Sequence, residues 1–237
     1  MMIKNKRLKI VLITILSLVV LLASAFFVYA SVYYRADAVA TAVLQSTAVT
    51  RGEDNLVIVS PAQPGDTALI FYPGAKVEHI AYLPILQKIS QISNITCILV
   101  KMPFNMAIFD VNAADEVIAQ FPEIKHWYIG GHSMGGAMAS SYASNNQDKV
   151  QGLILLGAYV YGDYPPDKSL TIYGTFNTSV ADAINYSDNI VVIEGGNHAQ
   201  FGNYGKQAGD PDATISSEEQ QNIAVIAIDE FIAKKGN

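Results

Sequence analysis

The sequence predicts an α/β protein in which a mostly parallel, eight-stranded sheet is flanked by helices and preceded by one N-terminal transmembrane helix. Three observations carry this prediction. Segments of strand character alternate with segments of helical character along most of the chain, which is the order of a parallel sheet with crossover helices. A glycine-X-serine-X-glycine pentapeptide lies between one such strand and the next helix. An uncharged apolar run of membrane-spanning length stands near the N-terminus.

The apolar run, residues 10–34, contains no acidic or basic side chain, and about 20 such residues suffice to cross a bilayer. The basic cluster that precedes it, in residues 1–9, consists of Lys4, Lys6, Arg7 and Lys9. Small-residue sites ending at Ala25 and Ala30 would suit a cleaved signal peptide, but the run exceeds the roughly 7 to 15 residues of a signal-peptide core. We therefore expect an uncleaved single-pass anchor in the cell membrane. Its basic end would stay cytoplasmic and the rest of the chain would be extracytoplasmic, or secreted if cleavage occurs.

Composition limits what the remaining chain can bind and how it is stabilised. A net charge of -6, with the only basic cluster at the extreme N-terminus, argues against a nucleic-acid partner. Cys97 is the single cysteine, so no intramolecular disulfide can form. We expect residues 35–46, rich in alanine and valine, to form a stalk, and residues 47–237 to form one α/β domain.

The expected elements of the domain follow one another in βα order. Two β-prone runs, Thr47 to Thr50 and Leu56 to Ser60, flank a turn-rich spacer and predict an antiparallel hairpin at the sheet edge. The next expected elements are strand Thr67 to Tyr72, helix His79 to Ile92, strand Thr96 to Met102, helix Asn112 to Phe121, strand His126 to Gly130 and helix Gly136 to Asn145. The last are strands Val150 to Leu156, Ser169 to Tyr173 and Asn189 to Ile193, and a helix from Ser217 to Lys234. Ser216 or Ser217 is expected to cap this helix, because Glu219 follows Ser216 at capping-box spacing.

The pentapeptide from Gly131 to Gly135 has the features of a nucleophile elbow. It joins an expected strand to an expected helix, and Ser133 stands at its centre. Flanking glycines let the backbone pass closely through a strained turn, which lifts the serine hydroxyl out of the sheet edge. The pattern therefore predicts that Ser133 is exposed for nucleophilic attack.

With these motifs in this order, the chain resembles the α/β-hydrolase superfamily, in particular its small single-domain bacterial members, which include dienelactone-hydrolase-like proteins. The resemblance covers roughly Val49 to Phe231. The segments that carry it are Phe71 to Ala75, Gly131 to Gly135, Ile172 to Gly174 and Gly195 to Gly202. It implies a serine hydrolase that acts on ester or other acyl bonds.

His198 is the candidate general base, because it follows the last expected strand by a Gly-Gly-Asn turn, from which an imidazole can reach a serine hydroxyl. The other three histidines have weaker claims, since they open a strand, begin a helix or lie within the elbow. The resemblance implies an oxyanion hole built from the backbone amides of Met134 and Ala75.

The orienting acid is where the sequence departs from the superfamily. The position that usually holds aspartate, three residues after Gly174, is Asn177. An asparagine can orient a histidine ring but cannot supply the negative charge that stabilises an imidazolium. Asp163 in the loop after the preceding strand is an alternative acid, and Asp182 is a further one.

Two classes of function remain open from the sequence. The first is a membrane-anchored serine hydrolase that cleaves a small ester or related acyl substrate through Ser133 and His198. The alternative is a catalytically weak or inactive α/β-hydrolase domain that binds a ligand or a protein, which the departure at Asn177 favours. The sequence holds no zinc motif, Walker lysine or dinucleotide fingerprint, so it implies no metal and no cofactor.

Overall fold

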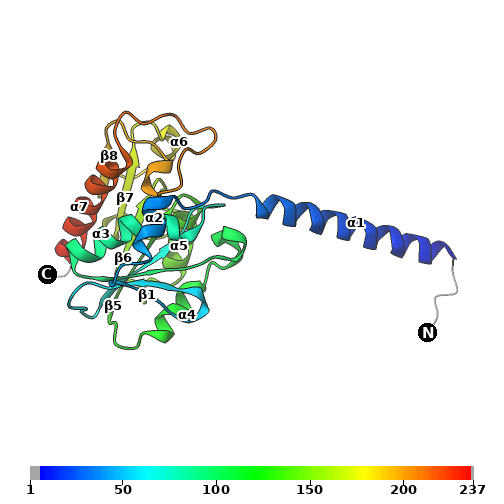
Figure 1. The fold of residues 1–237 in the computed structure, drawn as a ribbon, viewed down its shortest axis with the longest axis horizontal. Coiled ribbons are helices and arrows are strands. Elements are labelled where there is room, and N and C mark those ends of the chain that lie inside the picture. The colour runs from blue at the N-terminus through cyan, green and yellow to red at the C-terminus, as the bar shows by residue number, and fades with distance from the viewer. Residues whose placement is uncertain (1–5, 236–237) are drawn as a thin grey trace. The chain divides into compact units, whose positions relative to one another are not determined.

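The computed structural model describes residues 6–235, which belong to two compact units, residues 1–33 and 34–237 (Figure 1). In the first unit, helix α1 (Lys6–Ser31) exposes most of its apolar side chains. It is long and apolar enough to cross a membrane. Signal sequences near an N-terminus meet the same criteria of length and composition. Of the expected basic segment 1–9, residues 1–5 lie outside the described residues.

The second unit is built on an eight-stranded sheet in the order β1-β2-β4-β3-β5-β6-β7-β8. Its strands are β1 (Val49–Arg51), β2 (Val57–Val59), β3 (Thr67–Tyr72), β4 (Thr96–Leu99), β5 (His126–His132), β6 (Gly152–Leu156), β7 (Ser169–Gly174) and β8 (Ile190–Ile193). Strand β2 is antiparallel to both of its neighbours, and all other neighbouring strands are parallel. The predicted mostly parallel sheet with an antiparallel hairpin at one edge is confirmed.

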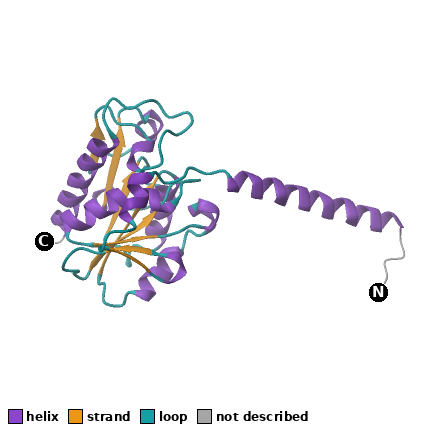
Figure 2. Cartoon of the chain, viewed as in Figure 1, coloured by secondary structure: helices purple, strands orange, loops and turns teal. Residues whose placement is uncertain are grey.

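Helices cover both faces of this sheet (Figure 2). The α-helices of the second unit are α2 (Ala38–Val43), α3 (Leu83–Ser93), α4 (Ala113–Gln120), α5 (Met134–Asn145), α6 (Thr178–Ala183) and α7 (Ser217–Lys235). Short 3₁₀ helices are η1 (Glu53–Asn55), η2 (His79–Tyr82), η3 (Pro103–Asn105), η4 (Ala107–Phe109), η5 (Pro166–Lys168) and η6 (Ala199–Phe201). One core lies under α3 and α7 and the other under α4 and α5.

The two cores follow from the alternation of side chains along the strands. In β3, Leu69 and Phe71 enter the core under α3 and α7, whereas Ala68, Ile70 and Tyr72 enter the core under α4 and α5. Because both faces are covered, the strand reads as a continuous apolar run, as expected for a central parallel strand.

Three local details differ from or refine the expectations. Residues 35–46, expected as a stalk, belong to the second unit, because helix α2 buries Ala40 fully and packs against α3. Helix α6 follows Asn177 without an apolar periodicity that would announce it. At α7, the Glu219 amide donates to the Ser216 hydroxyl over 3.1 Å, so Ser216 is the capping residue.

The ends of β7 and β8 approach so closely that one position there has no room for a side chain. A Cβ atom added to Gly174 would fall on the backbone carbonyl of Gly196. This approach sets the spacing between the loop after β7 and the loop after β8.

We therefore expect Gly174→Ala to lower the free energy of unfolding by about 1–3 kcal/mol, because the backbone must move to admit a methyl group. The control Gly65→Ala meets no heavy atom within 4 Å and should change stability by no more than about 0.5 kcal/mol. Urea unfolding of the full chain in detergent micelles, followed by the fluorescence of the buried Trp127, measures both. Equal stabilities of the two variants would contradict this interpretation.

Candidate active site

Ser133 occupies the sharp turn between β5 and α5. Its backbone has φ 54° and ψ −125°, a conformation that side-chain-bearing residues rarely adopt. Two close approaches require the glycines that flank it. A Cβ on Gly131 would lie 2.5 Å from the Tyr72 carbonyl oxygen, and one on Gly135 would overlap the carbonyl oxygens of Tyr72 and Pro73. The pentapeptide therefore has the spacing that lets the start of α5 pack against the end of β3.

Three loops at the carboxyl ends of parallel strands bring Ser133, His198 and Asn177 together. Nε2 of His198 lies 3.0 Å from Oγ of Ser133. Nδ1 of the same ring lies 2.8 Å from Nδ2 of Asn177. The three side chains that the sequence singled out as nucleophile, base and acid-position residue thus form one hydrogen-bonded row.

The amide orientation of Asn177 determines which nitrogen of His198 carries the proton. With Nδ2 facing His198 and Oδ1 accepting from the Ser179 hydroxyl over 3.1 Å, Nδ1 of the ring acts as acceptor and the proton sits on Nε2. The reversed amide satisfies the same groups, because Oδ1 then accepts from Nδ1 and Nδ2 donates to Ser179. Only the reversed arrangement leaves Nε2 free to accept the serine proton, and a carboxylate, which cannot donate, would enforce it.

Two buried side chains that sequence reasoning missed, those of Tyr82 and His132, connect to the backbone of His198. The Tyr82 hydroxyl accepts a hydrogen bond from the Gly74 amide over 3.1 Å and lies 2.8 Å from Nδ1 of His132. Nε2 of His132 lies 2.9 Å from the His198 carbonyl oxygen. Since a carbonyl can only accept, Nε2 of His132 carries the proton and Tyr82 donates to Nδ1.

Gly157, just after β6, lies against the side chains of His198 and Asn177. It has φ +54°, and a Cβ there would lie 3.0 Å from Nδ1 of His198 and 3.3 Å from Nδ2 of Asn177. A larger residue would press on the contact between these two side chains.

Asp210 is the second group that sequence reasoning missed. Its carboxylate accepts hydrogen bonds from the backbone amides of His198, over 3.2 Å, and Ala199, over 2.8 Å. Burial lowers the pKa of His198 below its usual range, and the Asp210 carboxylate raises it by a smaller amount. Asp210 lies 12 positions after His198, and no motif at that spacing marks the pair.

The two residues expected to form an oxyanion hole, Met134 and Ala75, each lie just after a strand. Met134 is the first residue of α5, so its N–H is one of the donors that a helix leaves without an intrahelical partner. Ala75 follows β3. The backbone amides on either side of it have partners of their own: the Gly74 amide donates to the Tyr82 hydroxyl, and the Lys76 amide donates to the Asn105 carbonyl over 2.7 Å.

The alternative acids are not brought to His198. Asp163 is exposed, and its backbone carbonyl accepts from the Gln147 side chain over 2.7 Å. Asp182 is exposed on α6. The place beside Nδ1 of His198 is filled by Asn177, because the turn after β7 delivers it there.

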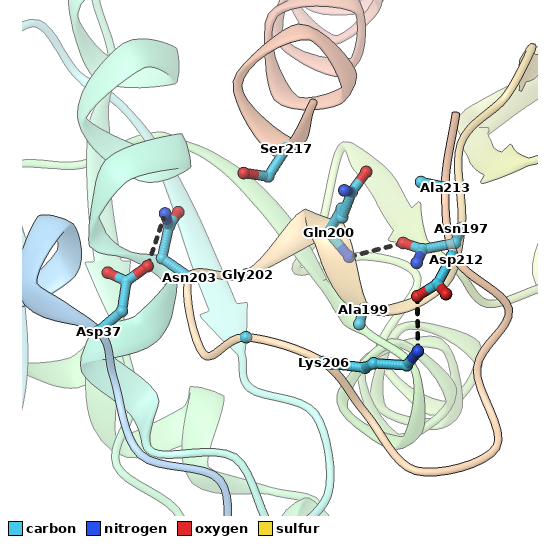
Figure 3. Close-up of a pocket in the computed structure, with 11 residues that line it drawn as sticks. Asp37, Asn197, Ala199, Gln200, Gly202, Asn203, Lys206, Asp212, Ala213 and Ser217 are labelled. Carbon is cyan, nitrogen blue, oxygen red and sulfur yellow. Dashed lines mark hydrogen bonds and ion pairs between the residues drawn. The ribbon is translucent and has the colours of Figure 1, made fainter. Parts of the chain in front are cut away.

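A cavity of about 550 Å³ opens beside Ser133 and His198, and segments 176–179 and 207–211 complete its lining. A neighbouring hollow of about 460 Å³ is lined by Asn197, Gln200 and Asp212, among others, and not by Ser133 (Figure 3). Within residues 6–235, no cluster of three histidine, cysteine or acidic side chains is placed to hold a metal ion.

The buried His132 makes stability depend on pH. Burial holds its pKa well below the usual range, and the unfolded-state value is about 6.5, so the unfolded chain binds the extra proton first as the pH falls. The contribution of the neutral ring is therefore complete above about pH 6.5 and is lost toward acid.

Between about pH 7 and 5, we expect the unfolding free energy of His132→Asn to fall less steeply than that of wild type, by up to about 1.4 kcal/mol per pH unit. Urea unfolding at several pH values provides the slopes. His126→Asn, which alters an exposed histidine, is the control and should keep the wild-type slope. Equal slopes for His132→Asn and wild type would contradict the expectation.

Solved structures with a similar fold are α/β hydrolases and esterases. Est1E from Butyrivibrio proteoclasticus, with bound ferulic acid, is 14% identical, with a TM-score of 0.54, over 76% of this chain and 95% of that chain. A soluble variant of monoglyceride lipase from Saccharomyces cerevisiae is 10% identical, with a TM-score of 0.53, over 81% and 97%. An alpha/beta hydrolase enzyme from the metagenome of Lake Arreo, Spain, is 13% identical, with a TM-score of 0.53, over 77% and 78%. At these identities the likeness shows the fold.

No curated protein sequence matches this chain. The sequence model of the alpha/beta hydrolase family matches residues 68–222, more than half of the chain, and this stretch contains Ser133, Asn177 and His198. The resemblance drawn from the motif order is thus confirmed: the chain belongs to the alpha/beta hydrolase family.

Proposed function

We propose that this protein is a membrane-anchored serine hydrolase that cleaves a small ester or related acyl compound. The observation that carries the proposal is the 3.0 Å contact between Ser133 Oγ and His198 Nε2, at the strained turn and beside a cavity of about 550 Å³. A serine hydroxyl is a weak nucleophile until a neighbouring base accepts its proton, and His198 provides that base in the tautomer whose Nε2 carries no proton.

The chemistry proceeds in two halves. Ser133 Oγ adds to the substrate carbonyl while its proton passes to His198 Nε2, and the amides of Met134 and Ala75 donate to the resulting oxyanion. Collapse expels the alcohol, which takes the proton from His198, and leaves an acyl group on Ser133. Water then repeats the sequence, giving its proton to His198 and releasing the acid.

Ester chemistry is supported by the kind of proteins that share the fold. Est1E binds ferulic acid, and the yeast relative is a monoglyceride lipase, so both handle carboxylic acids or their esters. Only segment 157–168 separates β6 from β7, which is too short to contain a lid domain at that connection. A cavity of about 550 Å³ suits a small acyl compound.

The proposal is tested by labelling the full chain in detergent micelles with a fluorophosphonate, which reacts with activated serines. We expect one label per chain, lost in Ser133→Ala and in His198→Ala. Ser217→Ala, which alters a serine of the neighbouring hollow in Figure 3, is the control and should label like wild type.

Failure of folded wild type to label would reject the hydrolase. The binding module, which the neutral Asn177 favours, would then be the better proposal. Ligand binding that survives Ser133→Ala, without turnover in wild type, would identify it.

We also propose that α1 stays on the mature protein as a single-pass anchor, with residues 34–237 outside the cytoplasm. A helix of 26 residues spans about 39 Å at 1.5 Å per residue, which exceeds the roughly 30 Å of a bilayer core. Its most apolar window has a mean hydropathy of 2.9, and the basic residues precede it, as in a cytoplasmic flank.

We expect the full chain to remain in the membrane fraction after alkaline carbonate extraction, because the hydrocarbon core retains a spanning helix. A chain that begins at Arg35 lacks α1 and should be recovered in the soluble fraction. N-terminal sequencing of the mature protein gives the second readout. A mature N-terminus at Phe26 or Ser31 would show a cleaved signal sequence and would overturn the anchor.

A further inference from the structure

The proposed reaction creates a positive charge for which Asn177 offers no counterion. When His198 takes the serine proton it becomes an imidazolium, and in a serine triad an aspartate beside Nδ1 stabilises that cation. Here the neighbour of Nδ1 is a neutral amide, 2.8 Å away. The negative charge must therefore come from elsewhere in the site or be missing from it.

The groups that face His198 leave one candidate for that charge. Ser133 and Asn177 are neutral, and His132, with its ring centroid 4.5 Å from that of His198, is kept neutral by burial. Asp210 is the one acidic residue among those that line the cavity. Its two carboxylate oxygens accept from the backbone amides of His198 and Ala199.

The loop that carries Asp210 is tied to the histidine turn at a second point. The Asn197 side chain donates to the Pro211 carbonyl over 2.8 Å, and the Asp210 amide donates to the Gln207 carbonyl over 3.2 Å. Gly209, with φ +83°, makes the bend before the carboxylate. Hydrogen bonds before and after Asp210 therefore fix its carboxylate relative to the backbone of His198.

We propose that Asp210 takes over the electrostatic role of the missing triad acid, while Asn177 supplies only the contact that orients the ring. Asp210 acts through His198 and is a positioning residue. The proton that His198 takes from Ser133 Oγ is returned to the departing alcohol. The inference rests on the proposed serine-hydrolase function.

A double-mutant cycle tests it, with kcat/KM for p-nitrophenyl acetate measured against pH on the full chain in detergent micelles. Loss of the carboxylate in Asp210→Asn should lower kcat/KM about tenfold or more and move the acid limb to lower pH, because the imidazolium loses its counterion. Asn177→Asp should raise kcat/KM. In the Asn177→Asp background, Asp210→Asn should cost less than about threefold, because a carboxylate beside Nδ1 makes the second charge redundant.

Asp212→Asn is the matched control. Asp212 lies in the same loop, is exposed and pairs with Lys206 over 2.7 Å in the neighbouring hollow (Figure 3). Its loss should leave both kcat/KM and the acid limb unchanged.

Two outcomes would overturn the role of Asp210. An equal loss from Asp210→Asn in both backgrounds, with an unmoved acid limb, would mean that Asp210 only holds the turn. An acid limb that shifts as far in Asp212→Asn as in Asp210→Asn would mean that any carboxylate of this loop acts on His198, and that the placement of Asp210 has no special role. The acid limb is measured on the active molecules alone, so this second test does not require all of the Asp210→Asn sample to fold.

Failure of the proposed function gives a different result. Wild type would then show no turnover that Ser133→Ala abolishes, and the role of Asp210 would be rejected with it. Turnover that depends on Ser133 but not on Asp210 would reject the role of Asp210 alone.

Discussion

The backbone conformation of Ser133 is the constraint on which the rest of the site depends. A non-glycine residue held at φ 54° and ψ −125° costs on the order of 1–3 kcal/mol, so the surrounding structure must enforce it. Strands β3 and β5 and the start of α5 do so through contacts that admit glycine alone at positions 131 and 135. Once the serine is fixed at this edge, the chain after β7 and β8 has to deliver its partners to the same place.

Much of this arrangement was predictable from local pattern. The βα alternation, the antiparallel edge hairpin and the serine turn each have a sequence signal, because buried parallel strands are apolar throughout and a strained turn requires small neighbours. Chain order then placed His198 and Asn177 near the serine, and the structure brings all three together. The packing of α2 could not be predicted, because an alanine-rich segment has the same composition whether it is exposed or buried, and Ala40 is buried.

The residues that sequence reasoning missed act through contacts that no spacing encodes. Tyr82 reaches His132 across 50 positions, and His132 reaches the carbonyl of His198 across 66. Asp210 binds backbone amides, which every residue carries, so neither partner has a distinguishing side chain. His132, within the elbow, had no sequence signal for a role, yet it connects Tyr82, after β3, to the turn that carries His198. Such long-range contacts follow from the fold as a whole.

The amide of Asn177 has a kinetic consequence of its own. Its two orientations satisfy the same neighbours, so the molecules divide between a competent and an incompetent tautomer of His198. In the hydrolase proposed above, turnover would equal the intrinsic rate of the competent form multiplied by the fraction of molecules in that form. The division would therefore lower kcat in proportion to the incompetent fraction. Such an enzyme would be slow because its molecules spend part of their time in the wrong protonation pattern.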